Sequence, residues 1–166
     1  YGRNARIGVV GLGTGTLGCY ARPGQQWRFY EIDPVMEALS RRRFTFLSRC
    51  VPQARVVLGD ARVSLERQAD RSLDVLALDA FSSDAVPMHL LTREAFATYR
   101  RVLSPSGVLA VHISNRFIDL APVIAAAARD GGWHAMLLSH NPSDLEEAAT
   151  PSSWIVLSRD PESFAF

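Results

Sequence analysis

Short apolar runs alternate with amphipathic segments along most of the chain. The amphipathic segments are typical of helices: they begin near Gly18, at Pro34, at Ala61, near Leu91 and at Asp119. The apolar runs are typical of buried parallel strands and cover 7–11, 27–32, 55–58, 73–78 and 108–113. Two more strand-like runs, 133–138 and 154–157, follow one another with only a polar segment between them.

Strands that alternate with helices predict an α/β fold in which a parallel sheet has helices on both faces. Because no helix separates the last two strands, we expect them to pair antiparallel. The pattern therefore predicts a Rossmann-like domain of the methyltransferase type, with a seven-stranded, mostly parallel sheet and an antiparallel last strand. Residues 1–166 suit one domain. In such a sheet ligands bind outside the carboxyl ends of the strands.

Composition and charge exclude several classes of function. The formal net charge of the 166 residues is +1, which gives no electrostatic reason to expect nucleic acid. All 18 basic residues are arginine, so neither a lysine Schiff base nor a P-loop lysine is possible. No metal site is predicted. No apolar run approaches the ~20 residues that span a membrane, and we see no signal peptide.

The two cysteines and the first residue bear on where the protein works. Cys19 and Cys50 lie far apart and form no C-x-x-C pair, so we expect buried free thiols in a reducing compartment. This favours a cytoplasmic location. The chain has no initiator Met, and we expect it to be a fragment of a longer protein, with a membrane tether of that protein as an open alternative.

A glycine-rich segment follows the first predicted strand. It reads Gly11-Leu-Gly13-Thr14-Gly15, and a helix is expected after it. Glycine lets a backbone turn sharply and approach a ligand closely, and a helix N-terminus presents free N–H groups to an electronegative ligand. A glycine turn that serves packing alone remains the alternative.

Acidic residues end the second and third predicted strands. Glu31 lies about 20 residues beyond the first glycine, where an acid accepts the ribose hydroxyls of a nucleoside, and Ile32 is placed to cover the base. Asp33 is expected to cap the next helix. Asp60 suits the amino group of an adenine or the N-cap of a helix that starts at Ala61, and its two oxygens permit both roles. A solvated acid is the alternative for Glu31.

The fourth strand ends in two carboxylates and two hydroxyls within six residues. Asp79 and Asp84 are candidates to hold a cationic amine and to take its proton, which an amine must lose before it attacks. An Asp/Ser turn that bonds its own backbone is the alternative. At the end of the fifth strand His112, Ser114 and Asn115 are candidates to line the same cleft, with His112 interpreted first as a structural histidine.

In their order and spacing these motifs resemble those of the spermidine synthase (polyamine aminopropyltransferase) family. The matching residues are 11–15, 31–33, 59–61 and 79–87, and the resemblance extends from 7 to 158. It is closest to spermidine-synthase-like domains of larger bacterial proteins. It implies the class I S-adenosylmethionine-dependent methyltransferase fold, decarboxylated S-adenosylmethionine or S-adenosylmethionine as co-substrate, a polyamine acceptor and a possible homodimer.

The resemblance also implies a role for each matching residue. Glu31 would bind the ribose, Asp79 would handle the attacking amine and Asp84 would help to hold the polyamine. Asp60 with Ala61 would bind the adenine, and Pro87 would pack near it. The predicted cofactor-binding residues are Gly11, Gly13, Thr14, Gly15, Glu31, Ile32, Asp60, Ala61 and Pro87, and the predicted catalytic residues are Asp79 and Asp84.

Three departures from the family pattern affect the amine side of the site. Thr14 stands where the family usually has an Asp, and Ser114 and Asn115 stand where it usually has an acid. The N-terminal β-hairpin region of the family is missing. The main expectation is aminopropyl transfer. A methyltransferase and a catalytically inactive nucleoside-binding domain are the alternatives, and a nicotinamide-dependent dehydrogenase is less favoured because its glycine fingerprint would start beyond the strand end.

Overall fold

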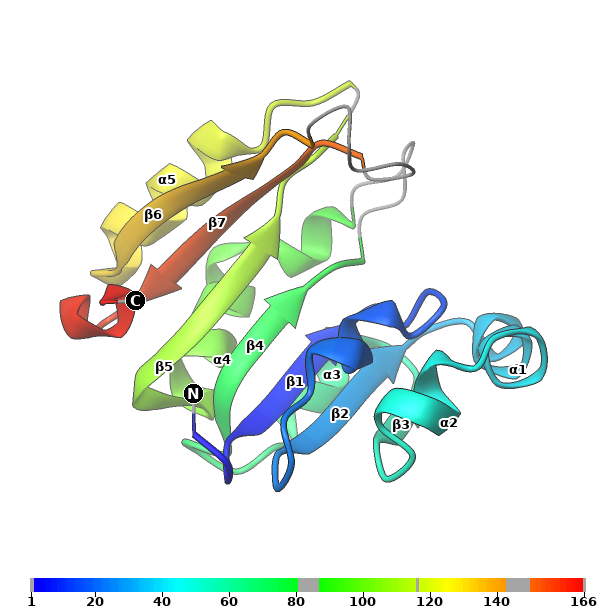
Figure 1. Ribbon diagram of the computed structural model, residues 1–166. Helices are drawn as coiled ribbons and strands as arrows, with labels where there is room; N and C mark the ends of the chain where they lie inside the picture. Colours follow the sequence, from blue (N-terminus) through cyan, green and yellow to red (C-terminus); the bar gives the residue numbers. More distant parts are fainter. Residues whose placement is uncertain (1, 81–86, 116, 143–149, 166) are drawn as a thin grey trace.

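The computed structural model describes residues 2–80, 87–115, 117–142 and 150–165. These residues form a seven-stranded sheet with the strand order β3-β2-β1-β4-β5-β7-β6 (Figure 1). The strands are β1 (Arg6–Val10), β2 (Gln26–Glu31), β3 (Arg55–Leu58), β4 (Leu73–Leu78), β5 (Leu103–His112), β6 (His134–His140) and β7 (Ser152–Ser158).

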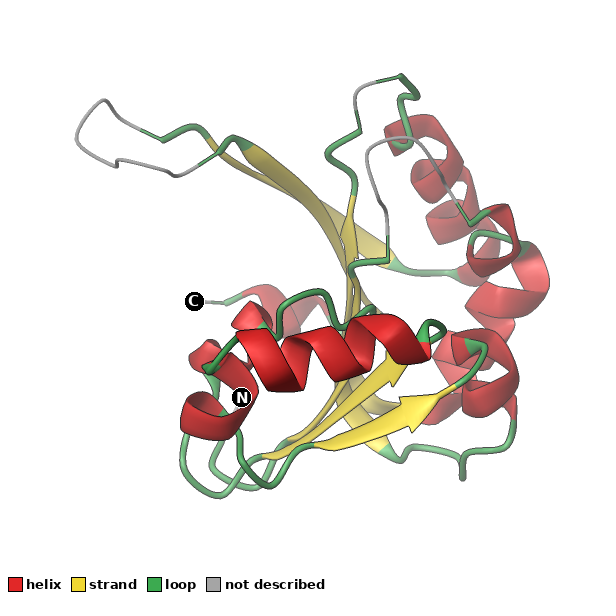
Figure 2. Cartoon of the chain, turned by 90° about the vertical axis from the view of Figure 1, so that its right-hand side faces the viewer, coloured by secondary structure: helices red, strands yellow, loops and turns green. Residues whose placement is uncertain are grey.

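Helices cover both faces of the sheet, as Figure 2 shows edge-on. A short 3-10 helix, η1 (Thr16–Tyr20), lies with α1 (Pro34–Arg43) and α2 (Phe46–Cys50) on one face. The opposite face carries α3 (Ala61–Glu66), α4 (Arg93–Val102) and α5 (Ala121–Gly131). Two more 3-10 turns are η2 (Met88–Leu90) and η3 (Pro161–Phe164).

The pairing of the strands confirms the predicted fold class. The first five strands run parallel to their neighbours, whereas β7 is antiparallel to both β5 and β6. A right-handed crossover helix follows each parallel strand in such a fold. The carboxyl ends of β1, β2, β3, β4 and β5 therefore meet at one edge of the sheet, and their loops form a common rim.

A separate hydrophobic core lies on each face of the sheet. The larger core packs α3, α4 and α5 against the sheet, and the smaller packs η1 and α2 against β1 and β2. Phe29 and Tyr30, neighbours on β2, point into opposite cores, as alternation along a strand requires. The buried Tyr99 hydroxyl donates a 2.9 Å hydrogen bond to the Leu90 carbonyl, so the larger core also anchors η2 at the rim. Burial raises the pKa of this phenol.

Several element boundaries differ from those that the sequence predicts. The helical segment expected to begin at Pro34 forms two helices, interrupted at Phe44 and Thr45. Strand β5 begins at Leu103 rather than Val108, because Leu103 pairs with Leu73 ahead of Pro105 and Gly107. The β4–β5 register then shifts between Leu73 and Val75, and such irregularities are where a sheet tolerates proline.

The prediction of two free thiols is wrong. Cys19 in η1 and Cys50 at the end of α2 form a disulfide, with their Cα atoms 4.8 Å apart. Their separation of 31 residues gave no sign of the pairing, which arises because α2 folds back against η1. The disulfide therefore fixes the segment that follows the glycine loop to the α1–α2 unit. Because these two cysteines are not free thiols, they no longer favour a reducing compartment.

Within the described ranges, no helix has both the length and the apolar character that crossing a membrane requires.

The disulfide should contribute substantially to stability. Replacing both cysteines, Cys19→Ser with Cys50→Ser, should lower the free energy of unfolding by about 3–4 kcal/mol, because the open 31-residue loop gains chain entropy in the unfolded state. Urea denaturation at equilibrium measures the change. Wild-type protein treated with a thiol reductant is the matched control and should unfold like the double variant. Equal midpoints for oxidised wild type and double variant would contradict the prediction.

Candidate functional site

Backbone hydrogen bonds extend the sheet one residue past the ends of three strands. The Gly11 N–H donates to the Tyr30 carbonyl (2.9 Å), and the Asp79 N–H donates to the Val10 carbonyl (2.8 Å). The Gly59 N–H donates in the same way to the Glu31 carbonyl (2.9 Å). The first residue of each rim loop is therefore held in register with its neighbour, so the residues that follow are placed by the sheet itself.

The glycine loop requires glycine at two positions. Gly11 has φ +93°, and a Cβ there would lie 2.4 Å from the Asp79 carbonyl oxygen. Gly15 has φ +89°, and its Cβ would lie 2.9 Å from Leu47 Cγ of α2. The buried Ser40 hydroxyl of α1 donates to the Thr14 carbonyl (3.1 Å). The helix that follows the loop is only the five-residue 3-10 helix η1.

Glu31 ties the glycine loop to β2. Its Oε2 accepts the Leu12 N–H (3.0 Å) and its Oε1 accepts the Asp33 N–H (2.9 Å). The residue is 8% exposed, and among the described residues it is the only charged one that is buried. Each carboxylate oxygen retains a further lone pair for a ligand hydroxyl. Asp33 caps α1 through Val35 N–H, as the sequence predicts.

Asp60 has two partners in the protein. Its Oδ1 accepts the Val63 N–H (3.0 Å) and so caps α3, as the sequence predicts. Its Oδ2 lies 3.2 Å from His89 Nε2, which extends from η2 across the rim. The sequence analysis missed His89, although its position two residues after Pro87 was a usable signal. An N–H donor on a ligand has to share Asp60 with this histidine.

A cavity of about 110 Å³ lies between these loops. It is lined by Val10, Gly11, Tyr30, Glu31, Ile32, Gly59, Asp60, Ala61, Ala80, Pro87, His89 and Leu90. The structure thus brings together six of the predicted binding residues: Gly11, Glu31, Ile32, Asp60, Ala61 and Pro87. Gly13, Thr14 and Gly15 belong to the loop beside the cavity rather than to its lining. Ile32, 67% exposed, offers an apolar surface at the mouth.

The candidate catalytic carboxylate of Asp79 lies at the same rim and points toward β5. Its Oδ1 is 2.8 Å from His112 Nδ1. Asp84, the second candidate, lies outside the described residues. Ser114 and Asn115 are occupied locally: the Ser114 hydroxyl accepts the Ser153 N–H (2.7 Å), and Asn115 accepts two N–H groups of its own loop. These two side chains therefore stabilise the strand end, which the sequence did not predict.

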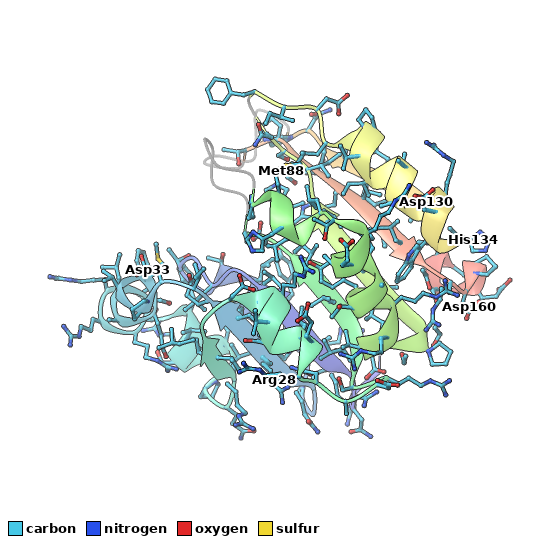
Figure 3. All side chains as sticks on the ribbon, turned by 180° about the vertical axis from the view of Figure 1, so that it is seen from behind. Arg28, Asp33, Met88, Asp130, His134 and Asp160 are labelled. Atoms are coloured by element: carbon cyan, nitrogen blue, oxygen red, sulfur yellow. A yellow bond between two sulfur atoms is a disulfide. The ribbon has the colours of Figure 1, made fainter. Side chains whose placement is uncertain are left out.

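A larger cavity, about 650 Å³, lies at the opposite edge of the sheet. Its lining includes Arg6, Gln26, Arg55 and Leu73, the first residues of β1, β2, β3 and β4. Parallel sheets of this class bind ligands at the carboxyl ends of their strands, so we take the smaller cavity as the candidate site despite its size. In Figure 3, Met88 of η2 is at the rim with the candidate site, whereas Arg28 is toward the opposite edge.

The comparison with known sequences gives one clear relative. The chain is similar to the polyamine aminopropyltransferase of Vibrio vulnificus (strain CMCP6), with 36% identity over 117 residues. The match covers 68% of this chain and 38% of that protein, so the chain corresponds to well under half the length of the relative. No family model matches the chain.

Solved structures share the fold. A probable spermidine synthase from Corynebacterium glutamicum ATCC 13032 superposes with a TM-score of 0.73 at 23% identity, over 94% of this chain and 56% of that one. Human methyltransferase-like protein 13, solved in complex with SAH, gives a TM-score of 0.72 at 21% identity, over 95% and 73%. At these identities the likeness establishes the fold alone, and transferases of two kinds share it.

Glu31 should matter for folding as well as for any ligand. In Glu31→Ala the N–H groups of Leu12 and Asp33 lose their acceptor, so the free energy of unfolding should fall by roughly 1–3 kcal/mol. Urea denaturation measures this. Glu66→Ala on α3 removes the same side chain from an exposed pair with Arg62, and it should change stability by less than about 1 kcal/mol. Equal effects of the two variants would show that the buried hydrogen bonds of Glu31 add no more to the free energy of unfolding than an exposed ion pair does.

Proposed function

Because this chain belongs to the spermidine synthase (polyamine aminopropyltransferase) family, we propose that it transfers an aminopropyl group from decarboxylated S-adenosylmethionine to a polyamine acceptor. One observation supports this most directly: the carboxylate of Asp79 stands at the rim beside a cavity with the residues of a nucleoside site. The carboxylate is 32% exposed, so an amine can reach it.

The cavity suits the nucleoside part of the co-substrate. Glu31 accepts the two ribose hydroxyls with the lone pairs that its backbone partners leave free. Ile32 and Pro87 provide apolar contacts for the base, and Asp60 accepts its amino group alongside His89. The positive φ at Gly11 brings the loop backbone close to the sulfonium end. These assignments agree with the chemistry of the groups present, and substitution of each residue tests its assigned role.

Asp79 takes the proton in the reaction. The sulfonium group makes the adjacent aminopropyl carbon electrophilic. A primary amine of the acceptor approaches that carbon, its nitrogen forms the new C–N bond, and the C–S bond breaks with its electron pair remaining on sulfur. Methylthioadenosine leaves as a neutral thioether, and the proton that the amine loses is held by Asp79. Before that step the charge of Asp79 attracts the ammonium form of the acceptor.

The amine side of the site departs from the family pattern at Thr14, which has no charge with which to select an aminopropyl ammonium. The loop should consequently bind S-adenosylmethionine and its decarboxylated form with comparable affinities. Asp84 is proposed to hold the distant part of the polyamine, and it lies outside the described residues. The proposal that the acceptor is a polyamine therefore rests on the carboxylate of Asp79 and on membership of the family.

Asp79→Asn should lower turnover by about 10²–10⁴, because the amide keeps the shape but cannot take a proton. The assay uses the natural protein in full length, decarboxylated S-adenosylmethionine and a panel of polyamines, and it follows release of methylthioadenosine. Binding of methylthioadenosine, measured by calorimetry, should persist in the variant. Asp130→Asn is the matched control, because this exposed aspartate pairs with Arg93 far from the rim (Figure 3).

Three outcomes would count against the proposal in different ways. If wild type is active and Asp79→Asn is equally fast, the proton acceptor is another group. If wild type releases no methylthioadenosine with any amine but binds the nucleoside tightly, the chain is a nucleoside-binding domain. If it demethylates S-adenosylmethionine in the presence of an acceptor, it is a methyltransferase.

A further inference from the structure

The register of the strands places a row of residues beside the proposed reaction centre. Val10 pairs with Leu78 and Leu78 pairs with Val111, so Gly11, Asp79 and His112 each stand one residue further along three adjacent strands. His112 in turn pairs with Trp154 of β7. Figure 1 shows the four strands side by side in this order. The row runs from the glycine loop, across the catalytic carboxylate, into the antiparallel part of the sheet.

His112 and Asp79 form the one polar contact of this row. His112 Nδ1 lies 2.8 Å from Asp79 Oδ1. An ionised carboxylate can only accept hydrogen bonds, so the ring must carry its hydrogen on Nδ1 and donate it. No described residue contacts the other carboxylate oxygen, Oδ2, through a hydrogen bond. Among the described residues, therefore, the protein holds one oxygen of the carboxylate and leaves the other without a hydrogen-bond partner.

Trp154 fixes the plane of the histidine ring. The two rings stack with centroids 4.7 Å apart and an interplanar angle of 16°. A stacked ring cannot swing away from Asp79 without losing that contact. The hydrogen bond and the stacking interaction come from different strands, β4 and β7, so His112 is held from both sides.

The second ring nitrogen cannot take part in chemistry at the rim. Nε2 of His112 is buried, and within the described part of the chain it has no hydrogen-bond partner. A substrate amine has no access to this atom in the structure. His112 is therefore not the group that removes the proton, although a histidine beside a carboxylate invites that interpretation.

We propose that His112 is a positioning residue for Asp79: its Nδ1–H holds Oδ1 so that Oδ2 faces the attacking amine, and Trp154 keeps the donor in place. The inference rests on the proposed function, because it assigns a role within that reaction. A carboxylate on a rim loop otherwise rotates among several arrangements, and displacement of a reacting group by about 1 Å costs up to ~10² in rate. Nothing in this role transfers a proton to or from the histidine.

Two exchanges at the same position separate hydrogen bonding from packing. His112→Phe keeps a flat ring against Trp154 but removes the donor, whereas His112→Asn removes the ring but keeps an N–H donor at the place of Nδ1. We expect His112→Phe to lower kcat roughly 10- to 100-fold with the KM for the nucleoside co-substrate unchanged, and His112→Asn to recover most of the loss. His134→Phe is the matched control. It makes the same exchange at an exposed position of β6, away from the rim (Figure 3), and should leave kcat unchanged.

The kinetic result can overturn the inference on its own. If the wild type is active and His112→Phe retains its kcat within about twofold, His112 has only a packing role. The same conclusion follows if His112→Asn is slower than His112→Phe. If the wild type transfers nothing to any amine, the proposed function fails, and the positioning role fails with it. These results are distinct, because only the first two require an active wild type.

A spectroscopic test needs no activity, and its main readout comes from the wild-type protein. The ¹⁵N NMR spectrum of wild-type protein labelled in its histidines reports which ring nitrogen carries the proton. We expect the hydrogen of His112 on Nδ1, and a changed Nδ1 signal in Asp79→Asn. The His112→Asn spectrum assigns the signal by its disappearance. A hydrogen on Nε2 with a bare Nδ1 would overturn the inference, even if every variant were active.

Discussion

The close approach of two backbones, where β1 and β4 end, determines the geometry of the rim. Gly11 has no side chain, and the carbonyl of Asp79 occupies the space where a Cβ would stand. The Asp79 N–H bonds to the carbonyl of Val10, so the contact is also part of the sheet ladder. Any larger residue at Gly11 would push the strand ends apart. The proposed proton acceptor would then move away from the loop that faces the nucleoside.

The two halves of the site are supported by different means. The proposed nucleoside half is held by side-chain hydrogen bonds to nearby backbone groups. Glu31 accepts an N–H of the glycine loop, Asp60 caps α3, and Ser40 of α1 donates to a carbonyl of the loop. The disulfide adds a covalent tie between η1 and α2 on the same side. The proposed amine half rests on one carboxylate, Asp79, which a side chain two strands from the glycine loop contacts. We therefore expect that mutation can separate binding from chemistry.

The same residues often serve the fold and the proposed reaction together. Asp60 caps α3 with one oxygen and lines the cavity, and Glu31 buries its charge against two backbone N–H groups. A carboxylate that already satisfies backbone donors is held rigidly, and a rigid acceptor binds a ligand hydroxyl with less loss of entropy. The stability of the rim loops and the proposed affinity for a nucleoside thus have a common origin in these acids.

The sequence by itself determined the alternation of strands and helices, and with it the fold and the edge where Gly11, Glu31, Asp60 and Asp79 meet. Periodicity and strand ends are local properties, which is why these positions were predictable. The structure decided the pairings between distant residues. Ser114 and Asn115, expected at the cleft, accept backbone N–H groups at the end of β5. Cys19 meets Cys50, His89 reaches Asp60, and His112 lies between Asp79 and Trp154. Each such pair joins elements whose distance only the packing of the sheet and helices sets.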